Sequence, residues 1–319
     1  MRDADNSPIL ELSVHESQSR LPALLRAFFI FDLHFARNFG KLWNDRYLLY
    51  ALTLRGIRGR YKQSMLGVGW ALLTPAAMTF VFSYMLSRTG ISGRMVYPCP
   101  MALYTLCMLT FWNLFSRSIT NGSTALVSNM DLVTKVYFPR EVLPIASVLM
   151  NLVDWFVAFL MYVFVAAVGT NCTHFLAKFS PNLATQFAGD YHFYPHANWL
   201  WVPVLMVLLL LFINGLVFIA ATLQVYFRDV AHLINLAVFL WLFMTPVLYP
   251  LRAIAGGRAS TLIIFNPVTG LLDGIQMALI SGHFPWEHHV LFAAAVSVFI
   301  FLAGYSFFKH EERFFADVV

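Results

Sequence analysis

The sequence predicts an all-α fold: a polytopic membrane protein with six transmembrane helices, N-terminal amphipathic helices at the membrane interface and short re-entrant gate helices on the outer side. Two observations predict this class. Hydrophobic residues make up 59% of the 319 residues and charged residues 12%, whereas about 25% of residues in ordinary soluble domains are charged. The apolar residues also occur in long continuous runs, which is typical of membrane spans rather than of a soluble core.

A transmembrane helix needs about 20 consecutive, mostly apolar residues. Prolines inside such a run do not exclude a span, because neighbouring helices can satisfy the backbone groups that proline leaves free. Six windows meet the length: Leu66–Ser87, Pro98–Thr120, Val142–Gly169, Trp199–Phe227, Ala231–Pro250 and Val290–Phe308. They divide the chain into an N-terminal extension at 1–65, a six-span domain at 66–308 and a tail at 309–319.

Positive charges predict how the spans are oriented, because Lys and Arg gather on the cytoplasmic side of a membrane. With the N-terminus inside, 16 of the 21 Lys and Arg residues lie in the cytoplasm. We therefore expect both termini there, together with the polar insert Asn121–Glu141 between the second and third spans. The same flanking positions account for the net charge of +5 without a nucleic-acid partner.

Two amphipathic segments precede the first span. From Leu24 to Leu42, large apolar residues recur at steps of three and four with charged residues between them, which predicts an interfacial helix. A second helix begins near Asn44 or Asp45, either of which can cap it. Its basic residues beside an apolar stripe are Arg55, Arg58 and Lys62. Two interpretations remain open: a basic helix on anionic lipid headgroups, or a surface that also docks a cytoplasmic partner.

A short helix is predicted inside the cytoplasmic insert, at about 128–138. Ser128 and Asp131 have the spacing of a capping box at its start. The helix must end before Pro139, which disfavours helical geometry in the residue that precedes it. From spacing alone this helix is either a plain connector or a functional element.

A second short helix is predicted on the outer side, within a segment at about 260–282. Asn266 has the position of its cap and Pro267 that of its first residue, while Gly282 closes it. The helix contains Asp273. At about a dozen residues it is too short to cross a bilayer, so we expect a re-entrant or interfacial gate.

Asp154 is the one carboxylate that lies well inside a predicted span. A charged carboxylate at the bilayer centre costs about 2.5–3.5 kcal/mol, so Asp154 should face protein or water. A structural hydrogen bond and a role in a channel both remain open. No metal site is predicted, because the cysteines lack metal-binding spacing and Pro195 breaks any helix that would present His192 and His196 together.

Several ordered motifs carry a resemblance to a known family. They are Arg58–Pro75, Lys135–Pro144, Phe227–Val230, Thr245–Pro250 and Asn266–Gly270. In these motifs the chain resembles the permease subunits of ABC transporters that export O-antigen, teichoic acid and related polysaccharides. The resemblance implies a permease homodimer in the inner membrane of a bacterium, surrounded by membrane lipids. The dimer would pair with two ATPase subunits and move a lipid-linked glycan outward.

The resemblance also implies that the cytoplasmic insert is a coupling segment, which means that it contacts the ATPase. Its helix dipole favours an acid in the first turn and a base in the last, and exposed aromatic side chains are typical anchors of an interface. The residues expected to act in this segment are Asp131, Lys135, Tyr137, Phe138, Arg140 and Glu141.

Aromatic residues in the spans are candidates for lining the glycan channel that the resemblance implies. Sugar rings present C–H faces that stack on aromatic rings. Aromatic residues in spans are also common at lipid-facing, interfacial and helix-packing positions, so the packing interpretation remains open for each. The candidates are Trp70, Tyr84, Phe111, Trp112, Trp155, Tyr162 and Trp241.

The sequence contains no Gly-x-x-x-x-Gly-Lys-Ser/Thr phosphate loop. We therefore expect no cofactor in this chain, with ATP and Mg²⁺ bound by the partner ATPase. Two other classes of function remain. A permease that exports a drug or another lipid-like amphiphile would have the same architecture. A membrane glycosyl- or acyltransferase would need acids, bases or a metal gathered at one membrane face.

Overall fold

Helices account for all regular secondary structure in the described part of the computed structural model. The described residues are 46–62, 64–67, 69–88, 99–135, 138–171, 197–251, 263–312 and 315. The predicted all-α class is confirmed for these residues. The interfacial helix predicted from Leu24 to Leu42 lies outside them.

The helices from residue 49 onward form one compact unit. In order, the described helices are α3 (Arg46–Tyr61), α4 (Gly69–Arg88), α5 (Met101–Ser123), the 3-10 turn η2 (Val127–Asn129), α6 (Met130–Lys135), α7 (Val142–Asn171), the 3-10 turn η3 (Ala197–Leu200), α10 (Trp201–Tyr226), α11 (Val230–Phe243), α13 (Pro267–Gln276), the π-turn η5 (Met277–Ser281) and α14 (His288–Glu311).

Three helical stretches are long and apolar enough to cross a membrane: Val142–Val168, Ala197–Tyr226 and His288–Glu311. They correspond to the third, fourth and sixth predicted spans. Helices α4 and α5 occupy the first and second predicted windows with 20 and 23 residues. Helix α11 has only 14 residues, about 21 Å at 1.5 Å per residue, which is short of a hydrocarbon core of about 30 Å. The count of six spans therefore stays a prediction.

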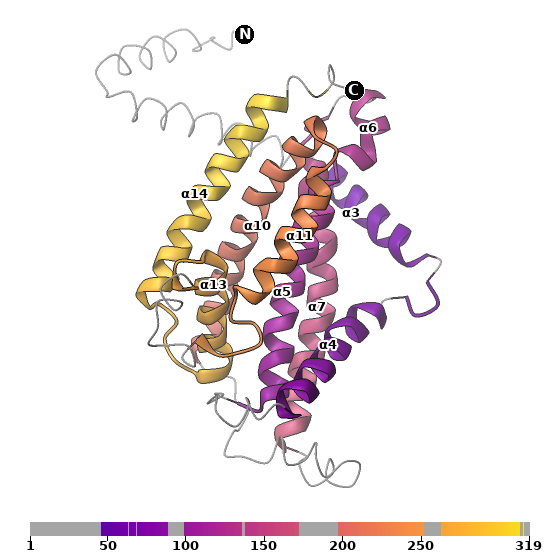
Figure 1. The fold of residues 1–319 in the computed structure, drawn as a ribbon. Helices are drawn as coiled ribbons and strands as arrows, with labels where there is room; N and C mark the ends of the chain where they lie inside the picture. The colour runs from indigo at the N-terminus through magenta and orange to yellow at the C-terminus, as the bar shows by residue number, and fades with distance from the viewer. Residues whose placement is uncertain are drawn as a thin grey trace, which may run out of the picture. The chain divides into compact units, whose positions relative to one another are not determined.

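Helix α5 lies at the centre of the bundle, with α4 and α7 on one side and α10 and α11 on the other (Figure 1). Of its 23 residues, 16 are buried. Because α5 faces protein, it tolerates polar residues that a lipid-facing helix would not. The Thr105 and Thr110 hydroxyls donate to the carbonyls of Met101 and Leu106, one turn back in the same helix.

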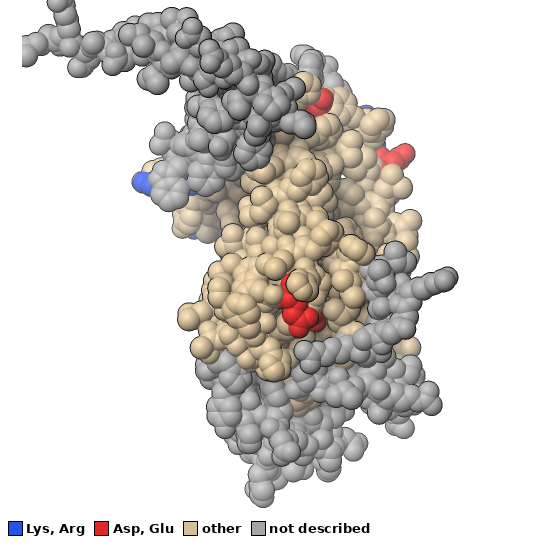
Figure 2. Space-filling view, turned by 90° about the vertical axis from the view of Figure 1, so that its left-hand side faces the viewer, with Lys and Arg blue, Asp and Glu red and all other residues tan. Residues whose placement is uncertain are grey.

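Helices α10 and α14 approach each other at two glycines. A Cβ atom added to Gly304 would lie 2.2 Å from the carbonyl oxygen of Gly215. Backbone therefore contacts backbone at this crossing, as small residues permit between membrane helices. On the other side of α14, the described surface in Figure 2 is almost free of charged side chains between its upper end and one acidic patch. An uncharged band of this kind is what lipid contact requires.

The two ends of the bundle carry the two short predicted helices. Helix α6 lies at the end where α14 finishes, and α13 lies in the opposite half (Figure 1). The predicted first and last residues of the short helix in the 260–282 segment are confirmed. The Asn266 side chain accepts a hydrogen bond from the backbone N–H of Val268, Pro267 is the first residue of α13, and Gly282 ends η5 with φ of 63°.

The start of the short helix predicted at about 128–138 differs from its prediction. Helix α6 begins at Met130, and Ser128 lies in the preceding 3-10 turn. The Ser128 hydroxyl donates to the carbonyl of Thr124, 2.8 Å away. The chain leaves α5 without first becoming extended, so the residue predicted as the cap has a carbonyl one turn behind it to bond instead.

Candidate functional site

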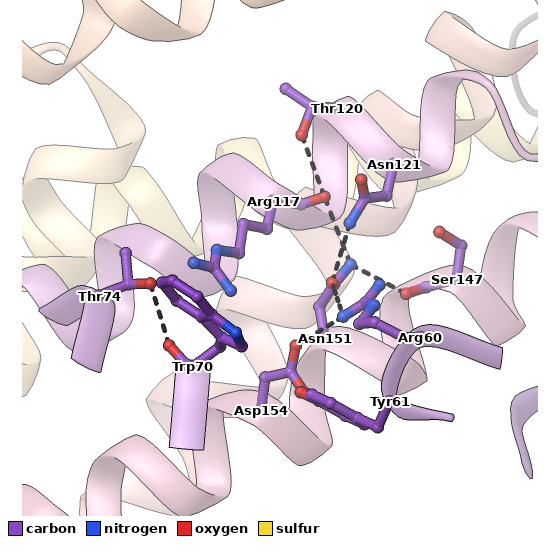
Figure 3. Close-up of polar contacts among 10 residues, drawn as sticks. All are labelled: Arg60, Tyr61, Trp70, Thr74, Arg117, Thr120, Asn121, Ser147, Asn151 and Asp154. Atoms are coloured by element: carbon purple, nitrogen blue, oxygen red, sulfur yellow. Dashed lines mark hydrogen bonds and ion pairs between the residues drawn. The ribbon is translucent and has the colours of Figure 1, made fainter. Parts of the chain in front are cut away.

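A buried polar cluster joins α3 to α7. The Arg60 guanidinium and the Tyr61 hydroxyl stand at the end of α3 and point at the Asp154 carboxylate of α7 (Figure 3). Arg60 Nη1 lies 2.5 Å from Asp154 Oδ2, and the Tyr61 hydroxyl donates to Asp154 Oδ1 over 2.5 Å. Each carboxylate oxygen therefore has its own donor. Asp154 is only 6% exposed, so this charge faces protein, as expected for a carboxylate within a span.

Asn151 extends the cluster to α5. It precedes Asp154 by one helical turn, which places both side chains on the same face of α7. Its Oδ1 accepts from Arg60 Nη1 at 3.2 Å and from Asn121 Nδ2 at 3.0 Å. Its Nδ2 donates to the carbonyls of Arg117 and Ser147. The amide thus has all its hydrogen bonds inside the protein, and it connects three helices.

The electrostatics of the cluster keep the Tyr61 hydroxyl protonated. Burial raises the pKa of Tyr61 from 10.0 to about 12, and the hydrogen bond to Asp154 and the charge of that carboxylate add to the rise. Tyr61 is therefore a neutral hydrogen-bond donor at physiological pH. The cluster holds one cation and one anion together, which limits the cost of burying either.

Two cavities flank the cluster, and their sizes differ greatly. The smaller, of about 20 Å³, is lined by residues of α4, α5 and α7 that include Asn113, Arg117 and Trp155. It has room for a single water molecule and none for a sugar ring. The larger, of about 430 Å³, lies between α3, α7 and the C-terminal end of α5. Only the larger cavity has the volume of a ligand site.

Sequence analysis singled out Asp154 but missed its partners. Arg60 belongs to the basic run that was assigned to lipid headgroups or a docking surface. A buried carboxylate needs a cation, and this run directly precedes the first span, so the signal for Arg60 was present. Asn151 carried a weaker signal, its position one turn before Asp154. The other basic residues of the run, Arg55, Arg58 and Lys62, are exposed.

The predicted coupling segment ends in a group of polar contacts with the end of α14, called the clamp below, formed by Arg140, Glu141, Lys309 and Glu312. Glu141 is 1% exposed and accepts a hydrogen bond from Lys309 of α14. Lys309 also pairs with Glu312 at 2.8 Å. Arg140 donates from its backbone N–H to the Glu312 carboxylate and from Nη1 to the Glu312 carbonyl. Burial raises the pKa of Glu141 above its ordinary value, and the Lys309 ammonium offsets part of that rise.

The remaining residues of this segment have fewer described contacts. Asp131 is exposed on α6, and Phe138 is half-buried. Tyr137 and the Lys135 side chain lie outside the described part of the chain. The structure therefore brings Arg140 and Glu141 together with the end of α14, and the coupling role of all six residues stays a prediction.

The aromatic residues predicted to line a channel fall into two groups. Trp70 and Tyr84 on α4 are 50% and 56% exposed. Phe111, Trp112 and Tyr162 are buried inside the bundle. Trp155 and Trp241 are half-buried against the aromatic core, with ring centroids 5.4 Å and 5.3 Å from Phe111 and Phe115. Among the seven candidates, Trp70 and Tyr84 of α4 are the exposed ones; the channel role itself stays a prediction for all seven.

Asn266, the predicted gate residue, joins the start of α13 to α11 and to the turn after it. The Trp241 indole N–H donates to Asn266 Oδ1 over 3.1 Å, and Asn266 Nδ2 donates to the Thr245 hydroxyl and the Met244 carbonyl. The candidate gate residue Asn266 and the candidate channel residue Trp241 are thus in direct contact. Farther along α13, Asp273 is buried and lies 2.8 Å from His289 Nε2.

Comparison with known proteins gives matches over most of the chain. A family model described as ABC-2 type transporter matches residues 47–280. The O-antigen export system permease protein RfbA of Myxococcus xanthus is 30% identical over 281 residues, which cover 88% of this chain and 98% of that protein. The protein of the same name from Klebsiella pneumoniae is 24% identical over 286 residues, covering 88% and 97%.

Proposed function

Because the chain belongs to the ABC-2 type transporter family, we propose that it is the permease subunit of an ABC transporter that exports a polysaccharide. The observation that carries this proposal is the similarity, over 88% of the chain, to permeases named for O-antigen export. The substrate is then a lipid-linked glycan such as O-antigen, and the direction of transport is outward across the bacterial inner membrane. Both termini and α6 face the cytoplasm.

The energy for transport comes from a separate ATPase subunit, which binds ATP and Mg²⁺. In support, the sequence contains no phosphate loop of the usual pattern. The ATPase acts on the coupling segment around α6. The clamp behind that segment ties Arg140 and Glu141 to Glu312 and Lys309. A push on α6 therefore reaches α7 and α14 together.

A second copy of the chain completes the glycan path. Trp70, Phe80 and Tyr84 give α4 an exposed aromatic face, and the Phe80 and Tyr84 rings stack with centroids 6.3 Å apart. Phe239 and Phe243 of α11 are also exposed. Two copies that meet along these faces would enclose an aromatic surface on which sugar rings slide. The buried aromatic residues of α5 and α7 support that wall from behind.

Co-purification with the candidate ATPase, followed by reconstitution into vesicles, tests the proposal. Lipid-linked O-antigen should raise the ATPase rate and should appear on the far side of the membrane only with hydrolysable ATP. An ATPase variant that binds ATP without hydrolysing it is the control. Stimulation by an amphiphilic drug with no response to glycan would contradict the substrate. Glycan bond formation in the absence of the ATPase would point to a transferase instead.

A further inference from the structure

The larger cavity beside the polar cluster has the composition of an anion site. Its volume of about 430 Å³ falls in the range of about 300–1,000 Å³ that is usual for small-molecule sites. Two of the lining residues are arginines and none is acidic. The lining residues are Leu52, Arg55, Gly56, Gly59, Arg60, Asn121, Thr124, Ala125, Ser128, Asn129, Leu143, Ala146, Ser147 and Met150.

The two arginines contribute differently to the charge of the cavity. The Asp154 carboxylate neutralises the positive charge of Arg60. Both described hydrogen bonds of Arg60 use Nη1, and because a guanidinium has five N–H donors on three nitrogens, other donors remain for a ligand. Arg55 is exposed and has no ion-pair partner among the described residues. The cavity therefore has one uncompensated cation, and further donors from a second guanidinium that Asp154 and Asn151 hold in position.

Most neutral polar groups that line the cavity already donate hydrogen bonds within the protein. Asn121 Nδ2 donates to Asn151, the Thr124 and Ser128 hydroxyls donate to backbone carbonyls, and Asn129 Nδ2 donates to the Ala125 carbonyl. Recognition therefore falls mainly to the guanidinium groups. A guanidinium binds phosphate through paired N–H···O bonds, and a diphosphate offers oxygens to both arginines.

Gly59 lines the cavity at a point where a larger side chain would have room to enter it. A glycine inside a helix costs about 0.5–1 kcal/mol relative to alanine. Packing accounts for Gly56, because a Cβ atom there would lie 1.9 Å from Met150 Sδ. It does not account for Gly59, where a Cβ atom would meet nothing within 4 Å. At Gly59 the missing side chain leaves the cavity open.

We propose that this cavity binds the phosphate-bearing headgroup of the lipid that carries the glycan. The identity of that lipid rests on the proposed function, whereas the phosphate chemistry rests on the cavity itself. Helix α3 exposes the aromatic Tyr50 and the basic Arg58, residue types that are common where a helix meets the membrane interface. A lipid headgroup reaches such a site from the membrane plane. The bound phosphate contacts Arg60, and through it Asp154 and α7.

Binding to the full chain, assembled with its ATPase in nanodiscs of neutral phosphatidylcholine, tests the proposal. The probes are farnesyl diphosphate, inorganic pyrophosphate and phosphatidylglycerol, with affinity measured by titration. Arg55→Gln should weaken farnesyl diphosphate binding about tenfold, as expected for a lost charge-assisted contact. Arg58→Gln removes the same charge from the same helix, but its side chain does not line the cavity. Equal affinities for the two variants would overturn the proposal.

A pair of steric variants tests the cavity without changing its charge. Gly59→Leu should fill the space and abolish binding, whereas Gly59→Ala adds one methyl group and should retain it. If the Arg55→Gln variant does not assemble with the ATPase, this pair of variants still tests whether the cavity binds the diphosphate. Unchanged binding by Gly59→Leu, with normal melting and ATPase assembly, would refute the site.

The three probes distinguish the sources of phosphate. Farnesyl diphosphate that binds at least tenfold more tightly than the other two supports the glycan carrier. Equal binding of phosphatidylglycerol would assign the site to bulk lipid, and equal binding of pyrophosphate would assign it to a free anion; either result overturns the carrier assignment. Failure of the wild-type complex to export glycan would instead contradict the proposed function and leave these binding results standing.

Discussion

Replacement of Arg60 by glutamine should destabilise the protein, because it leaves the buried Asp154 carboxylate without its cation. Removing one partner of a fully buried ion pair costs about 3–5 kcal/mol. Here the Arg60 side chain is 32% exposed, so solvent already screens part of the pair, and the Tyr61 hydroxyl still donates to the carboxylate. We therefore expect a loss of about 2–3 kcal/mol in the free energy of unfolding.

Asp154→Asn should cost less than Arg60→Gln. Asp154→Asn removes the buried charge itself, and the arginine that remains is partly hydrated. We therefore expect the free energy of unfolding to fall by about 1–2 kcal/mol, which is the contribution of a hydrogen bond to a charged group. The double variant Arg60→Gln with Asp154→Asn should then be more stable than the sum of the single changes predicts, since each single variant leaves one charge unpaired and the double variant leaves none.

Thermal unfolding of the detergent-solubilised full chain measures these differences. At about 2–4 °C per kcal/mol for a chain of this order of size, Arg60→Gln should lower the melting temperature by about 4–12 °C. Arg58→Gln, an exposed arginine of the same helix, is the control and should shift it by less than about 2 °C. Equal melting of Arg60→Gln and wild type, or strict additivity in the double variant, would refute the ion-pair explanation.

Three further predictions concern the cluster, the clamp and the coupling segment. Because the pKa of Tyr61 is raised to about 12, its stabilising hydrogen bond is present below pH 10 and lost as pH rises to 12 and beyond; the melting difference between wild type and Tyr61→Phe should shrink over that window, and a constant difference would count against it. Lys309→Met leaves Glu141 buried without a cation and should cost about 2–3 kcal/mol, most of which Glu141→Gln in the same chain should restore; no rescue in unfolding measurements would show that the pair is not the cause. Tyr137→Ala with Phe138→Ala should leave the complex assembled while ATP hydrolysis continues without export, and normal export by that variant would reduce the segment to a connector.

Helix positions and several helix ends were predictable from sequence, because they depend on residues within a few positions of one another. Asn266 caps α13 and Gly282 ends the turn that follows it, since cap bonds and a left-handed backbone are local properties. The long apolar runs likewise correspond to α7, α10 and α14. At Ser128 a local pattern was misleading, because the path of the chain out of α5 gave the hydroxyl a different acceptor.

Only the tertiary structure decided which side chains meet. Arg60 and Asp154 are 94 positions apart, and Glu141 and Lys309 are 168 apart; nothing local specifies such pairs. The aromatic residues make the same point, because Trp70 and Tyr162 both lie in apolar runs, yet one is half exposed and the other fully buried. Lipid and protein neighbours are equally apolar, so hydrophobicity identifies a span but not the face of it that packs. That face is chosen by the shapes of the neighbouring helices.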